Sequence, residues 1–153
     1  MTDEQTELLR EWLERLRDAQ KVHYRMGHFL RWWYLIIGLP IVIFSCISAF
    51  LAFGLPIVAW TNASIWAGVG SMIVAVLASI QTFLRLNELA DAHVKAAKGY
   101  ANLKVELEHV LAFPPPDGQM QPQLDDFRRR WEVVNNDAPE APGKLWADRR
   151  KPA

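Results

Sequence analysis

Residues 32–84 read WWYLIIGLPIVIFSCISAFLAFGLPIVAWTNASIWAGVGSMIVAVLASIQTFL and contain no Asp, Glu, Lys or Arg. All 34 charged residues of the chain lie before Trp32 or after Leu84. A bilayer core about 30 Å thick is crossed by about 20 apolar residues in a helix, so this segment is long enough for two spans and a turn. The sequence therefore predicts an all-α integral membrane protein whose bilayer-embedded part is a two-helix hairpin with long cytoplasmic helical extensions.

Turn-forming residues divide the uncharged segment. The stretch GLPIVAWTNAS contains Gly, Pro, Asn and Ser, which predicts span one at 32–53, an outer loop at 54–64 and span two at 65–84. The loop contains no Lys or Arg, whereas basic residues precede the first span and follow the second. By the positive-inside rule, both termini are then expected in the cytoplasm, with the protein in the plasma (inner) membrane as a multi-pass chain.

The segment before the first span predicts a helix of a different kind. Residues 3–30 place apolar side chains at helical spacing and charged side chains on the opposite face, which indicates an amphipathic helix. Because this charged segment comes first, and because the apolar run after it is longer than the core of a signal peptide, we expect retained membrane anchors.

The chain beyond the second span divides at a proline cluster. No Pro occurs between Leu84 and Pro114, so the helix of span two is expected to continue as a cytoplasmic helix at 85–113. Residues 1–113 would thus form the two-span domain, and residues 114–153 a Pro-rich tail with a short amphipathic helix at 122–134. One face of that short helix, comprising Leu124, Phe127 and Trp131, is expected either to fold back on the helical bundle or to receive a partner, and it is the candidate partner contact.

One face of the long helix changes chemistry where the spans end. Inside the predicted bilayer it carries small, weakly polar residues, namely Ser64, Gly68, Ser71, Ala75, Ala78 and Thr82, with Gln81 beside them. Beyond the bilayer it becomes mostly apolar, at Leu89, His93, Ala96, Tyr100, Leu103 and Leu107. Small residues allow close helix contact in lipid, and apolar heptads associate in water. Two interpretations stay open for the first set: packing within one chain, or a pore lined by several hairpins.

Several classes of function lack support in the sequence. The net charge is zero and the pI about 6.9, so no basic excess indicates nucleic-acid binding. No nucleophile or nucleotide-binding motif occurs, and we expect no enzyme, no catalytic residue and no cofactor. Glu106 and His109 have the spacing of di-iron ligands, but this motif occurs once and the chain has a single cysteine, Cys46, so no metal site is predicted.

The long cytoplasmic helix carries a family resemblance. The stretch LRLNELADAHVKAAKGYANLKVELEHVL, residues 84–111, follows two spans and a charged N-terminal helix, and the architecture of residues 8–113 resembles the SLATT domains of prokaryotes. The similarity in spacing rests on Arg85, His93, Ala97, Tyr100, Leu103 and Glu106. It implies a membrane effector of antiphage and related conflict systems that forms pores when a nucleotide-signalling enzyme or sensor partner reports infection.

These observations lead to two functional hypotheses. The first is a homo-oligomeric, pore-forming effector that disrupts the lipid bilayer when its cytoplasmic helices are activated. The second is a passive membrane anchor or scaffold that recruits a soluble partner. A pore built from hairpins needs roughly four or more copies, whereas an anchor can be a monomer or dimer.

Overall fold

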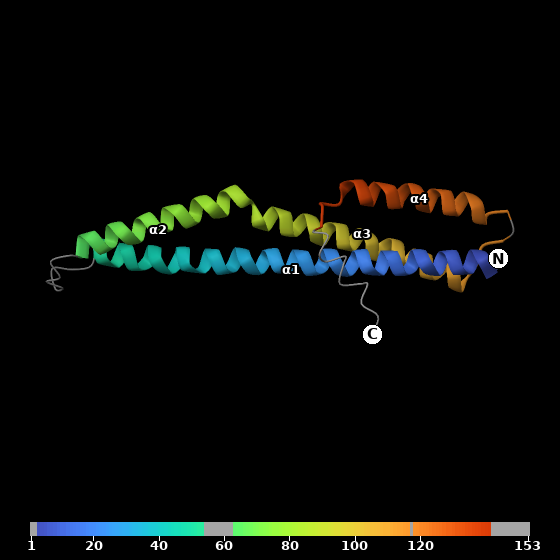
Figure 1. Ribbon diagram of the computed structural model, residues 1–153, viewed down its shortest axis with the longest axis horizontal. Helices are drawn as coiled ribbons and strands as arrows, with labels where there is room; N and C mark the ends of the chain where they lie inside the picture. Colours follow the sequence, from blue (N-terminus) through green and yellow to red (C-terminus); the bar gives the residue numbers. More distant parts are fainter. Residues whose placement is uncertain (1–2, 54–62, 117, 142–153) are drawn as a thin grey trace. The chain divides into compact units, whose positions relative to one another are not determined.

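The computed structural model describes residues 3–53, 63–116 and 118–141, and all regular secondary structure in these residues is helical (Figure 1). In chain order the helices are α1 (Asp3–Phe53), α2 (Ala63–Leu84), α3 (Leu86–Ala112) and α4 (Met120–Asp137). The predicted all-α class is confirmed. The predicted outer loop lies mostly outside the described residues.

Helix α1 joins two segments that the sequence predicts separately. It runs without interruption from Asp3 to Phe53, through the amphipathic segment and the first apolar run. Asp3 and Glu4 lie in its first turn, where carboxylates interact favourably with the helix dipole. Pro40 lies inside α1, and its ring prevents one backbone hydrogen bond without ending the helix.

The expectation of one continuous helix after the turn is wrong at a single residue. Arg85 separates α2 from α3 and has a φ of 44°, in the left-handed region that interrupts a right-handed helix. Such a conformation costs a non-glycine residue roughly 1 kcal/mol. Neither Gly nor Pro marks this position, so the sequence pattern contains no signal for the break.

The chain forms two compact units, and α1 contributes its first part to one and its second part to the other. We call Phe29–Glu88 the two-helix unit, and Met1–His28 together with Leu89–Ala153 the three-helix unit. The two-helix unit consists of the second half of α1 packed against α2, and the three-helix unit consists of the first half of α1 with α3 and α4.

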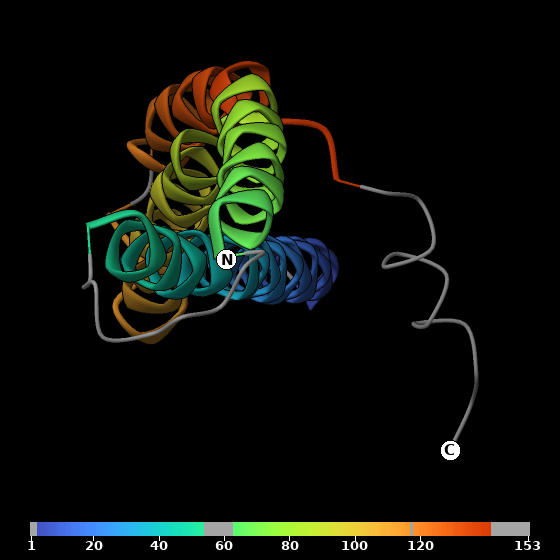
Figure 2. The same ribbon diagram turned by 90° about the vertical axis from the view of Figure 1, so that its left-hand side faces the viewer.

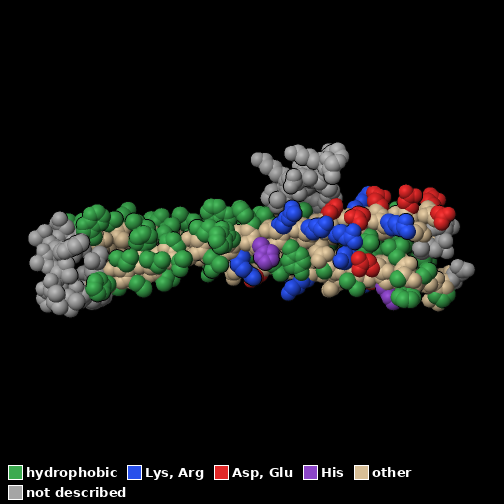
Figure 3. Space-filling view, turned by 90° about the horizontal axis from the view of Figure 1, so that it is seen from below, with side chains coloured by type: hydrophobic (Ala, Val, Ile, Leu, Met, Phe, Trp, Pro, Cys, Tyr) green, Lys and Arg blue, Asp and Glu red, His purple; other side chains and the backbone are tan. Residues whose placement is uncertain are grey.

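The surface of the two-helix unit is hydrophobic (Figure 3). Large apolar side chains point outward along both helices, including Trp32, Leu39, Val42, Phe50, Met72 and Phe83. The stretches Asp3–Phe50 and Ile65–Ala112 are each long enough, and contain a window apolar enough, to cross a membrane. Only 6% of either window is buried, whereas a core helix of a soluble protein is mostly buried.

The three-helix unit has an ordinary hydrophobic core. Figures 1 and 2 show α4 running alongside α3. Side chains from all three helices form one buried cluster, comprising Leu9, Trp12, Leu16, Ala19, Ala96, Tyr100, Leu103, Leu107, Val110 and Phe127. Trp12 stacks on Phe127 with ring centroids 6.1 Å apart, so α1 and α4 are in direct contact.

Helix α4 is longer than the predicted 122–134 and its apolar face is covered. Phe127 is buried, while Leu124 and Trp131 pack against the core cluster. The face predicted to receive a partner therefore folds back on α1 and α3, because burying these side chains within the chain removes them from water.

Candidate functional site

The small-residue stripe of α2 lies mostly on the outside of the two-helix unit. Gly68, Ser71, Ala75 and Thr82 are exposed, while Ala78 and Gln81 are half-buried. A Cβ atom added at Gly68 would have no neighbour within 4 Å. The side chain of Ser64 lies outside the described part of the chain.

A neighbouring stripe of α2 makes the contact with α1. Ser48 of α1 is buried opposite Gly70, where a Cβ would overlap the Ser48 Oγ. The Gln81 side-chain amide donates a 3.4 Å hydrogen bond to the Tyr34 carbonyl. The stripe of α2 that contacts α1 is thus offset by about one residue from the stripe of small residues that the sequence pattern predicts. The buried and half-buried residues of α2 follow this second stripe, namely Ala67, Gly70, Val74, Leu77, Ala78 and Gln81.

The described hydroxyl groups of α2 bond within their own helix. The Ser71 hydroxyl donates to the Ala67 carbonyl at 2.9 Å, and the Thr82 hydroxyl donates to the Ala78 carbonyl at 2.9 Å. Ser79 bonds in the same way to Ala75. Such bonds satisfy hydroxyl donors without water, as a lipid environment requires.

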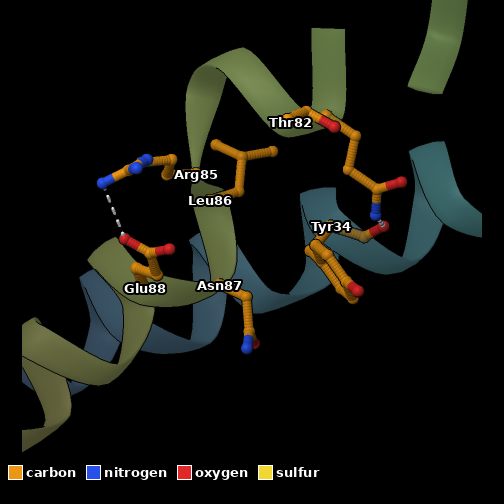
Figure 4. Close-up of a pocket in the computed structure, with 7 residues that line it drawn as sticks. Tyr34, Thr82, Arg85, Leu86, Asn87 and Glu88 are labelled. Atoms are coloured by element: carbon orange, nitrogen blue, oxygen red, sulfur yellow. Dashed lines mark hydrogen bonds and ion pairs between the residues drawn. The ribbon is translucent and has the colours of Figure 1, made fainter. Parts of the chain in front are cut away.

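A polar cleft of about 420 Å³ lies beside the break between α2 and α3 (Figure 4). It is lined by Tyr34, Gln81, Thr82, Arg85, Leu86, Asn87 and Glu88. The Arg85 guanidinium is paired with the Glu88 carboxylate at 3.3 Å, and both side chains are mostly exposed. The cleft therefore collects the first charged groups that follow the apolar segment.

The predicted apolar seam beyond the bilayer is largely buried in the three-helix unit. His93, Ala96, Tyr100, Leu103 and Leu107 are all buried. Leu89 is the exception, because it is 39% exposed while Ala90 is fully buried in its place. Counting back three residues from His93, instead of four, gives the residue that the fold buries.

Two histidines form the most unusual polar contact among the described residues. His23 of α1 and His93 of α3 are 3% and 1% exposed, and their Nδ1 atoms are 2.9 Å apart, within hydrogen-bond distance. Burial lowers the pKa of both imidazoles below the ordinary value of 6.5, and the charge of His93 lowers the pKa of His23 further. The sequence places His23 at an apolar position of helix 3–30 but contains no signal that pairs it with His93.

Tyr100 links this pair to α4. Its ring centroid is 5.4 Å from that of His23, and its hydroxyl donates a 2.8 Å hydrogen bond to the Asn135 side-chain oxygen. Burial raises the pKa of the Tyr100 phenol, so the phenol is a neutral donor. Two hydrogen bonds and one ring contact thus connect His23, His93, Tyr100 and Asn135 across α1, α3 and α4.

The described residues contain no group of three His, Cys, Asp or Glu side chains placed to hold a metal ion. Glu106 instead accepts two hydrogen bonds from Arg130 of α4, at 2.6 and 2.5 Å, and Arg130 also pairs with Asp126 at 2.9 Å. The hydrogen bond to Glu106 is the main cause that raises the pKa of Arg130.

The sequence matches no protein-family model, no curated protein and no solved structure.

Proposed function

We propose that the chain is a two-span membrane protein in which residues 32–53 and 65–84 cross the bilayer and both termini lie in the cytoplasm. The exposed apolar shell of the two-helix unit supports this proposal. Apolar surface costs about 25 cal/mol per Å² in water, and lipid removes that cost. The basic residues that flank both spans, together with their absence from the loop, support the orientation.

We further infer that the protein assembles into a homo-oligomer through α2. The observation that carries this inference is that α1 packs on Ala67 and Gly70 and leaves the stripe at Gly68, Ser71 and Ala75 uncovered. In lipid, small residues on an outer face favour close approach of another helix. A second copy of the chain offers the same stripe and is the simplest occupant.

The activity that fits such an assembly is a pore that disrupts the membrane. Ser71 and Thr82 would lie at or beside its lumen, where each hydroxyl oxygen keeps lone pairs to accept from water. The resemblance to SLATT domains supports a defence effector activated by a nucleotide-signalling partner. Several of the residues that carry it have structural roles, since Arg85 lies at the helix break, Tyr100 is in the core and Glu106 anchors α4.

A passive anchor is the competing function. The internal hydrogen bonds of Ser71 and Thr82 favour it, because a hydroxyl satisfied by its own helix needs no water-filled lumen. An anchor would recruit a soluble partner through the exterior of the three-helix unit, since the apolar face of α4 is covered.

One experiment separates these functions. Ion flux through liposomes would be measured for the purified chain, and the oligomer mass would be determined in the same detergent preparation. Gly68→Leu should reduce both, because its side chain would obstruct the outer stripe at a position where an added Cβ has no neighbour within 4 Å. Met72→Leu, at a 71% exposed position, is the matched control and should change neither. A monomer or dimer without flux would favour the anchor.

A further inference from the structure

The geometry of the His23–His93 contact limits how many protons the two rings can take up while they stay hydrogen-bonded. A hydrogen bond between two Nδ1 atoms at 2.9 Å needs one ring with hydrogen on Nδ1 and one ring with a free lone pair there. A first proton can add to Nε2 of the donor ring, which leaves the bond in place and makes it charge-assisted. A second proton must add to the accepting Nδ1, so two N–H groups and two positive charges then oppose each other.

Among the described residues, no buried carboxylate lies ready to compensate the doubly charged pair. The aromatic neighbour of His23 is the neutral Tyr100, whose hydroxyl is bonded to the neutral amide of Asn135. Within three positions of His23, His93 and Asn135 every charged residue is exposed, namely Lys21 and Arg25 on α1, Asp91 and Lys95 on α3, and Glu132 and Asp137 on α4. Asp18, five positions before His23 on α1, is half-buried. Two like charges buried at this separation are strongly unfavourable.

We propose that the His23–His93 pair is a proton-responsive latch, which holds α1 against α3 while it carries at most one extra proton and releases them when it takes up a second. Release would expose the pair to water and hydrate both imidazolium groups. The lowered pKa of each ring supports this direction, because neutral rings are favoured while the pair is buried.

Opening of the latch would also couple acidification to the apolar segment. Helix α1 continues without a break from His23 into residues 32–53. Opening of the three-helix unit is therefore expected to alter the constraint on the first span. This last step rests on the proposed pore function, whereas the latch itself does not.

The first test uses the full-length wild-type chain in detergent. The ¹⁵N chemical shifts of the imidazoles would be followed from pH 8 to pH 4.5, and amide hydrogen exchange of α1 and α3 would be measured over the same range. We expect the protection factors of the amides around His23 and His93, taken relative to the intrinsic exchange rate at each pH, to fall at least tenfold as the second imidazole is protonated, below pH 6.5. Protonation of both rings with unchanged protection factors would overturn the latch.

The second test replaces the pair by apolar side chains of similar size. The double variant His23→Leu with His93→Leu should keep its helicity and exchange protection at pH 5, because no buried group is left without a partner. His28→Gln and His109→Gln, both at exposed positions, should retain the wild-type transition. A transition that persists in the double variant would assign the pH response to other groups.

Ion flux through liposomes at pH 7.5 and pH 5 distinguishes this inference from the proposed function. Opening of the three-helix unit at pH 5 without flux would leave the latch standing and count against the pore. Flux that appears at pH 5 in wild type and double variant alike would leave the pore standing and overturn the step from the latch to the first span.

Discussion

Gly99 of α3 lies directly against Val134 of α4. A Cβ atom built at Gly99 would be 3.1 Å from Val134 Cγ1 and 3.3 Å from Cγ2, closer than ordinary van der Waals contact. The absence of a side chain at Gly99 thus sets how near α4 approaches α3. The small groove beside this contact, about 220 Å³, is lined by residues of the same two helices.

Enlarging Gly99 should loosen α4. We expect Gly99→Leu to destabilise the three-helix unit by about 1–3 kcal/mol, as overpacking of a well-filled core does. Chemical denaturation followed by tryptophan fluorescence measures this loss, since Trp12 and Trp131 lie in the three-helix unit. Adding Val134→Ala should restore part of the stability, and failure of that rescue would place the strain elsewhere.

The two glycines of α2 should respond differently to the same substitution. Gly70→Leu would overlap Ser48, so it should lower the thermal stability of the two-helix unit in detergent. At Gly68 an added Cβ would have no neighbour within 4 Å, so Gly68→Leu should leave that stability unchanged. Thermal unfolding monitored by circular dichroism compares them, and equal losses would contradict the observed packing of α2 on α1.

The ion pair between α3 and α4 should contribute little to stability. Arg130 and Glu106 are 47% and 30% exposed at their side chains, so water and salt screen the attraction. We expect Arg130→Ala to cost about 0.5–1 kcal/mol at low salt and less at 1 M salt. Arg129→Ala, which removes a more exposed pair with Asp126, should cost less. A salt-independent loss at Arg130 would indicate packing by its aliphatic stem.

The stability of the three-helix unit should fall in acid. Because the folded pKa of His23 and of His93 lies below the ordinary value of 6.5, the unfolded chain binds more protons once the pH drops below 6.5. Stability should be constant above about pH 7.5 and decrease by up to about 1.4 kcal/mol per pH unit for each histidine below pH 6.5. Urea unfolding at pH 8, 6.5 and 5.5 measures the slope, which the double leucine variant should flatten.

The sequence by itself determined the helical class and the helices' approximate extents. Charge-free segments, helical periodicity and the proline cluster at Pro114 are local signals, and the structure has helices over these regions. The seam positions from His93 to Leu107 are buried in the three-helix unit, because a heptad pattern specifies one face of a helix.

The tertiary structure alone decided which faces meet. The sequence pattern predicted a contact at the small residues Gly68 and Ser71, whereas α1 packs on Ala67 and Gly70. Several faces of a uniformly apolar helix allow close contact, and the shape of the partner helix determines which face is used. The pairing of His23 with His93 joins residues 70 positions apart, so no local pattern encodes it. The left-handed backbone of Arg85 likewise has no local signal in the sequence. Sequence periodicity assigns a residue to a face, whereas three-dimensional packing assigns that face its neighbour.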